Sequence, residues 1–194
     1  ALIDDDTPPP EHAQHSHARL ARVLAIGLAL WVLPMALLAA WVGVHGTYTQ
    51  MGWFFTKAAL LTFGGAYAVL PYVYQGAVTH FAWLTPAQMI DGLALGETTP
   101  GPLIMVVAFV AFVGGWQSSE LAALFGADQR FAAAALAAVV VTWFTFLPSF
   151  VFILAGGPLV ESTHGDLKFT GPLTAITAAV VGVIVNLARF FGQH

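Results

Sequence analysis

Hydrophobic residues run along this chain in stretches of about twenty, not in short alternating segments. Such stretches cover residues 20–44, 130–154 and 172–191, and the first carries no charge after Arg22. About twenty apolar residues cross a bilayer as a helix, whereas a barrel strand shows about ten residues of alternating pattern. The pattern therefore predicts three full transmembrane helices.

Between the first two long stretches lie two pairs of short helical segments, each interrupted by helix-breaking residues. The segments and their interruptions are 48–63 and 66–78 around Gly64 and Gly65, and 85–97 and 102–116 around TTPGP at 98–102. Thr85 is the expected N-cap of the third segment, with Pro86 at its first position. Each segment is short for a full crossing, so each pair forms either a discontinuous span or a re-entrant hairpin.

The remaining segments are polar connections. Residues 1–18 are acidic and proline-rich and are predicted to form a disordered linker or tail, while 19–194 form the transmembrane domain. Histidines in that tail are commoner in flexible linkers than in metal sites, so no metal site is expected. Residues 117–129 should form a polar connection with one interfacial turn, and 156–171 a loop.

Composition narrows the class further. The chain is 58% hydrophobic and only 8% charged, whereas a soluble domain keeps about a quarter of its residues charged. Without a basic patch, a nucleic-acid partner is not expected. Cysteine is absent, which excludes disulfides, thiolate metal sites and cysteine catalysis. No cofactor is expected, and the composition predicts an all-α integral membrane protein.

The two interruptions are the strongest functional signal. Unpaired backbone groups in lipid cost several kcal/mol each, so a broken helix needs protein or water around its break, and paired breaks point to a transport site. Half-helices that start at Gly65 and Gly101 point free N–H groups and about half a positive charge outward, which suits an anion. The alternative is that Gly64, Gly65 and Pro100 only permit kinks and close packing.

The second proline and the two threonines of the break bear on the same question. Pro102 at the first helical position loses no hydrogen bond, because that N–H would be unpaired anyway. Thr98 and Thr99 either donate hydrogen bonds to an oxyanion or cap the helix.

Charged residues also fall where lipid is expected. Lys57 supplies positive charge for an anion, pairs with Glu97, or extends to the headgroups. Glu97 ends its short helix, where the dipole disfavours a carboxylate, so it pairs with Lys57, takes up a proton, or bonds the freed amides. A bound anion would favour protonated Glu97, which couples proton and anion binding positively, as in symport. Asp91 is expected to face water.

Other polar residues argue less for function. Thr142, Thr145 and Ser149 share one helix face, but such hydroxyls, like Asn186, more often hold helices together. The histidines at 45, 80 and 164 are expected in loops, and no HExxH or GxSxG motif occurs. An intramembrane enzyme is therefore disfavoured, which leaves a transporter or a structural membrane subunit.

Two phrases of this sequence, FGGAYAVLPYV and GETTPGPLI, resemble the two signature regions of the chromate transporter (CHR) family. TFLPSFVFILAGGPLVE and AVVGVIVNL also resemble its later spans, so the similarity covers about residues 50–190. Many members of that family have two homologous halves of inverted orientation. The chain resembles the second half, with the proline-rich start as the linker between halves.

The resemblance implies a multi-pass transporter in the inner (plasma) membrane of a prokaryote that exports chromate, a tetrahedral dianion shaped like sulfate, and gives chromate resistance. Its partners would be chromate or sulfate, the lipid bilayer, and either the homologous N-terminal half or a second copy. The positions carried over as substrate-binding are Lys57, Thr62, Gly64, Gly65, Tyr67, Thr98, Thr99 and Gly101. Glu97 is the candidate for proton coupling, and Pro100 and Pro102 form the structural break.

Overall fold

The computed structural model of this chain describes residues 17–61 and 66–162, and all of its regular elements there are helical. In chain order they are α1 (His17–Val42), α2 (Thr47–Leu61), α3 (Ala66–Tyr74), the π-helix η3 (Gln75–His80), α4 (Pro86–Thr98), the 3₁₀ turn η4 (Leu103–Met105), α5 (Val106–Gln117), α6 (Ser119–Phe125), the 3₁₀ turn η5 (Ala127–Gln129) and α7 (Arg130–Ser162). The predicted all-α membrane class is confirmed.

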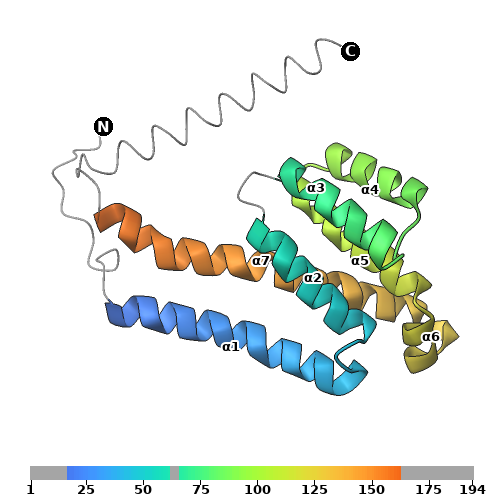
Figure 1. The fold of residues 1–194 in the computed structure, drawn as a ribbon, viewed down its shortest axis with the longest axis horizontal. Helices are drawn as coiled ribbons and strands as arrows, with labels where there is room; N and C mark the ends of the chain where they lie inside the picture. The colour runs from blue at the N-terminus through green and yellow to red at the C-terminus, as the bar shows by residue number, and fades with distance from the viewer. Residues whose placement is uncertain (1–16, 62–65, 163–194) are drawn as a thin grey trace, which may run out of the picture.

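Helices α1 and α7 are each long and apolar enough to cross a membrane, α7 over Arg130–Gly157. They lie side by side and run in opposite directions (Figure 1). The pair Leu103–Gln117 and Ser119–Phe125 is a third candidate if it counts as one span, bent by 69°. The third long stretch predicted above, 172–191, lies outside the described residues, as does the tail up to residue 16.

Three predicted boundaries need correction. Helix α7 continues to Ser162, so the loop expected over 156–171 is wrong for 156–162, because paired glycines weaken a helix without necessarily ending it. Helix α1 already begins at His17, inside the predicted tail. The connection 117–129 holds a full helix, α6, instead of a single turn.

The alanine-rich first half of α7 packs closely against α5. A Cβ added to Gly115 of α5 would lie 2.8 Å from the Ala137 Cβ and 3.1 Å from the Ala134 Cα. Both alanines are buried. Small residues let the two backbones approach, which is how helices associate where lipid removes the hydrophobic driving force.

Hydrogen bonds from aromatic side chains connect α7, α1 and α2. The Tyr48 hydroxyl of α2 donates to the Ala133 carbonyl of α7 at 2.9 Å. Trp31 of α1 donates its indole N–H to the Thr56 hydroxyl of α2 at 3.0 Å. These bonds fix the three helices relative to one another, and α3 and α4 lie on the side of α2 away from α1 (Figure 1).

The start of α2 is held by a residue that the sequence did not single out. Glu120 of α6 accepts hydrogen bonds from the Thr47 amide at 2.9 Å and the Thr47 hydroxyl at 2.6 Å. A carboxylate at a helix N-terminus interacts favourably with the helix dipole. Glu120 therefore joins α6 to the helix that carries Lys57.

Candidate functional site

The predicted helix start at Thr85 is confirmed. The Thr85 hydroxyl accepts from the Gln88 amide at 3.2 Å, and the Gln88 side chain accepts from the Thr85 amide at 3.0 Å. This reciprocal capping box, with Pro86 at the first helical position, fixes where α4 begins.

The predicted interruption after α4 is also confirmed. Helix α4 ends at Thr98, and the chain is non-helical from Thr99 to Pro102. A short 3₁₀ turn, η4, then leads into α5, and no side chain caps it. The second half-helix therefore begins with amides that no capping side chain satisfies.

The two threonine hydroxyls cap α4 in this structure. Thr98 donates to the Ala94 carbonyl at 3.0 Å and to the Leu95 carbonyl at 3.2 Å. Thr99 donates to the Leu95 carbonyl at 2.6 Å. Since a hydroxyl has one hydrogen, each would have to release its carbonyl before it could donate to a bound anion.

A pocket of about 370 Å³ opens beside the break, between α4 and α5. We call it the break pocket, and it is lined by Gly92, Leu95, Gly96, Thr99, Gly101, Pro102, Met105, Val106, Ala108, Phe109, Phe112 and Ala138. Its lining is mostly apolar and holds no charged side chain. Any attraction for an anion there must come from backbone amides and the dipole of α5.

A second pocket of about 370 Å³ lies between α2 and the stretch from α3 to the π-helix. We call it the lysine pocket, and it is lined by Phe54, Lys57, Tyr72, Gln75, Gly76, Thr79, His80 and Phe81. Lys57 is exposed, with its ammonium 5.9 Å from the centroid of the Trp53 ring. This pocket combines a full positive charge with several polar side chains.

The lysine pocket depends on a helix type that the sequence analysis missed. Residues 75–80 form a π-helix, with the Phe81 amide bonded to the Gly76 carbonyl at 2.9 Å, and His80 is part of it and not of a loop. A Cβ on Gly76 would lie 2.1 Å from the Phe54 ring, so only glycine allows this approach. In the sequence, the only signal for this irregular helix was Gly76, which follows soon after Pro71.

The structure distributes the predicted site residues over separate places. Lys57 lines the lysine pocket, whereas Thr99, Gly101 and Pro102 line the break pocket, and the two pockets share no residue. The other predicted residues that the structure describes, Tyr67, Glu97, Thr98 and Pro100, are exposed.

The predicted Lys57–Glu97 pair and the first interruption differ in whether the structure describes them. Within the described part of the chain, no ion pair joins Lys57 to Glu97. Thr62, Gly64 and Gly65 lie outside the described residues. Convergence of two half-helix N-termini therefore remains a prediction.

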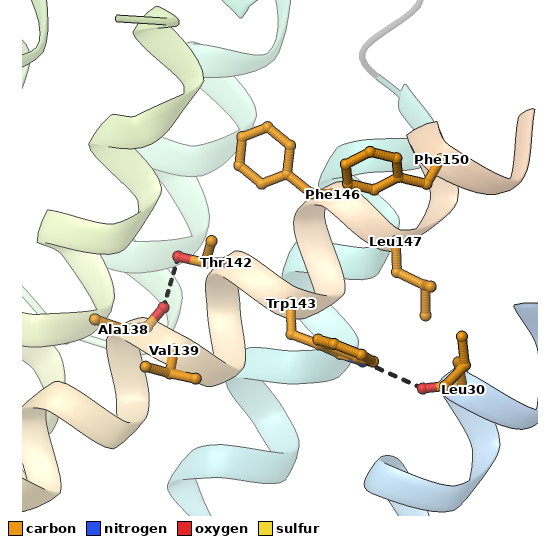
Figure 2. A pocket seen from close by; sticks show the side chains of 8 residues that line it. All are labelled: Leu30, Ala138, Val139, Thr142, Trp143, Phe146, Leu147 and Phe150. Carbon is orange, nitrogen blue, oxygen red and sulfur yellow. Dashed lines mark hydrogen bonds between the residues drawn. The ribbon is translucent and has the colours of Figure 1, made fainter. Parts of the chain in front are cut away.

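A larger groove of about 670 Å³ lies between α1 and α7 (Figure 2). Its one aliphatic hydroxyl, on Thr142, donates to the Ala138 carbonyl of its own helix at 2.7 Å. The indole of Trp143 donates to the Leu30 carbonyl at 3.2 Å (Figure 2). With both donors engaged and aliphatic and aromatic side chains around them, this groove suits apolar contact and not an anion.

The predicted hydroxyl face of α7 is not a single polar surface. Thr142 is half-buried, Thr145 is buried and Ser149 is exposed. Asn186, also considered above, lies outside the described residues. The three described hydroxyls therefore do not form one polar site.

Comparison with known proteins agrees with the sequence phrases. Residues 49–194 match the family model described as "Chromate transporter". A chromate transport protein of Pseudomonas aeruginosa is 36% identical over 180 residues, which cover 90% of this chain and 38% of that protein. A chromate transport protein of Cupriavidus metallidurans is 32% identical over 146 residues, which cover 73% of this chain and 32% of that protein.

A probable chromate transport protein of Synechococcus elongatus is 30% identical over 168 residues, which cover 84% of this chain and 37% of that protein. The chain thus spans well under half the length of these relatives. No solved structure matches it significantly. The match over three quarters of the sequence, a range that includes both breaks, shows that the chain belongs to the chromate transporter family.

Proposed function

We propose that this chain transports chromate across the membrane, in the direction of export, and that it also accepts sulfate, which has the same shape and charge. The observation that carries the proposal is the match of residues 49–194 to the chromate transporter family. Relatives named as chromate transport proteins align with 90% and 73% of the chain. A family resemblance gives the substrate class, and the site must supply the chemistry.

The proposed transport path combines backbone amides at the break pocket with one cation in the separate lysine pocket. Residues of the uncapped turn η4 and of helix α5 line the break pocket, and their amides and dipole are proposed to attract the anion there. Gly65 is proposed to start the facing half-helix, with Thr62, Gly64 and Tyr67 beside it. Lys57 is proposed to supply the full charge. Because the hydroxyls of Thr98 and Thr99 are bonded to α4 carbonyls, we assign the contribution of the break chiefly to the backbone.

Glu97 is the proposed coupling group. It is exposed in the last turn of α4, where the dipole disfavours a carboxylate. An anion bound nearby would favour its protonated form, so that protons and anions bind together. Simple electrostatics then favours symport over proton exchange.

The proposed setting is the inner membrane of a prokaryote, in a multi-pass arrangement with a partner. The chain spans 38% of the Pseudomonas relative and 32% of the Cupriavidus relative. A homologous N-terminal half or a second copy of this chain is the proposed partner. Inverted repeats of this kind place the substrate site at the interface of the halves.

Chromate transport into everted membrane vesicles tests the proposal, using the complete natural polypeptide. Export in cells corresponds to uptake in such vesicles. We expect Lys57→Ala and Gly65→Leu to abolish uptake at unchanged membrane insertion. Arg130 is an exposed cation that lines neither pocket, so Arg130→Gln should retain uptake. Wild-type uptake by both site variants would overturn the proposed site. No uptake by the unaltered protein would favour a structural membrane subunit.

A further inference from the structure

We propose that the lysine pocket is a second binding site for a dissolved tetrahedral oxyanion, separate from the break pocket. Lys57 supplies the charge, and Gln75 and Thr79 supply hydrogen bonds. The substrate class rests on the proposed function, whereas the site rests on the geometry of α2 and the π-helix.

No residue that the structure describes neutralises the charge in this pocket. Among the residues that the structure describes, Lys57 forms no ion pair, and its ammonium lies over the Trp53 ring, 5.9 Å from the ring centroid. A cation over an indole ring is held in place but keeps its charge and its three N–H donors. An anion entering the pocket would therefore find an available ammonium group.

The π-helix brings the polar side chains to one face. In an α-helix, residues five apart point about 140° away from each other, because each residue turns the helix by about 100°. The i→i+5 bonding of a π-helix places such residues above one another instead. Gln75 and His80 are five apart, with Thr79 beside them, and all three line the pocket.

Within the described part of the chain, Gln75 and Thr79 keep their side-chain donors available for a ligand. The hydroxyls of Thr98, Thr99 and Thr142 donate to carbonyls of their own helices. In contrast, the side chains of Gln75 and Thr79 form no hydrogen bond within the described residues. An amide and a hydroxyl offer three hydrogens between them for oxyanion oxygens.

Aromatic rings form the wall behind the polar groups. Phe54 stacks on Tyr72 with ring centroids 4.9 Å apart, and its edge meets Phe81 at 5.6 Å. Gly76 lets Phe54 approach the π-helix backbone. An apolar wall excludes water from one side, which lowers the local dielectric and strengthens the attraction between Lys57 and an anion.

A lipid phosphate shares this chemistry, since it also presents tetrahedrally arranged oxygens and negative charge. Lysines near membrane surfaces do extend to headgroups. The pocket holds about 370 Å³, enough for a small oxyanion with part of its hydration shell. We assign it to a dissolved oxyanion, and the experiment separates the two sources.

The test is equilibrium binding of chromate to the purified full chain in phosphatidylcholine nanodiscs. We expect Lys57→Gln to weaken binding at least tenfold, and Gln75→Leu and Thr79→Val by about two- to tenfold each, as for a typical net hydrogen bond. Arg130→Gln and Thr142→Val are the matched controls and should bind as the unaltered chain does. Retained phosphatidylglycerol is measured in parallel by phosphorus content.

Three outcomes would overturn the second site. Unchanged chromate affinity in all three pocket variants would do so, as would variants that change only phosphatidylglycerol retention. Loss in the matched controls as well would show a general effect instead of a site. If the pocket variants bind chromate with unchanged affinity while the unaltered protein transports chromate in vesicles, the proposed function stands without this second site.

Discussion

The two pockets of similar size differ in what they offer a negative ion. The break pocket has uncapped backbone amides, a helix dipole and a mostly apolar lining. The lysine pocket has a full positive charge and polar side chains without partners in the described residues. A dipole end carries about half a charge, whereas an ammonium carries one, so the lysine pocket should bind a dianion more tightly.

This difference shows that a helix break and a charged site need not coincide. The break after α4 leaves backbone amides without helix partners, and such amides are costly in lipid unless protein, water or a ligand satisfies them. The π-helix places side chains around a lysine on a different helix. An ion that crosses the membrane needs binding weak enough to leave again, so one tighter and one weaker site would serve transport better than a single tight one.

The largest expected effect distinguishes the glycines of the two pockets. A Cβ on Gly76 would lie 2.1 Å from the Phe54 ring, whereas one on Gly101 would meet nothing within 4 Å. We expect Gly76→Ala to destabilise the protein by about 1–3 kcal/mol through overpacking, and Gly101→Ala to change stability by less than about 0.5 kcal/mol. Thermal unfolding in detergent measures both, and equal losses would contradict the packing described for Gly76.

A smaller effect is expected at the start of α4, which forms one wall of the break pocket. Thr85→Ala removes the acceptor for the Gln88 amide and should cost about 1 kcal/mol of stability. Thr85→Ser keeps the acceptor and is the control. If the two substitutions lower the melting temperature equally, the capping box does not fix this helix.

The smallest expected effect concerns the threonines. Thr99→Val removes a hydroxyl already bonded to the Leu95 carbonyl, so chromate affinity should change by less than about twofold. Thr79→Val removes a hydroxyl without a partner in the described residues and should weaken binding more. Chromate titration of the two variants compares them, and a larger loss for Thr99→Val would reverse the ranking of the pockets.

Local chemistry made part of this structure predictable. The N-cap at Thr85, the proline after it and the interruption at 98–102 depend on residues near each other in sequence, and the structure confirms all three. The apolar lengths likewise predicted α1 and α7 as spans. These features follow from hydrogen bonding and hydropathy within one segment.

The lysine pocket could not be predicted in the same way. Whether residues 75–80 bond as an α- or a π-helix depends on packing against Phe54, which comes from another helix. Lys57 was identified as a charge in the membrane, but its neighbours Gln75 and Thr79 come from a later segment. Tertiary packing brings Gln75 and Thr79 to Lys57, and no local sequence pattern indicates that packing.

The most direct test of the account uses the absence of cysteine from the chain. A single Thr79→Cys or Thr99→Cys substitution gives one thiol per chain, and its modification rate is measured against sulfate concentration, since chromate oxidises thiols. We predict that sulfate protects the thiol at position 79 at lower concentration than at 99, and that adding Lys57→Gln removes the protection at 79. If sulfate does not protect the thiol at position 79, or if Lys57→Gln leaves that protection unchanged, the lysine pocket is not an oxyanion site.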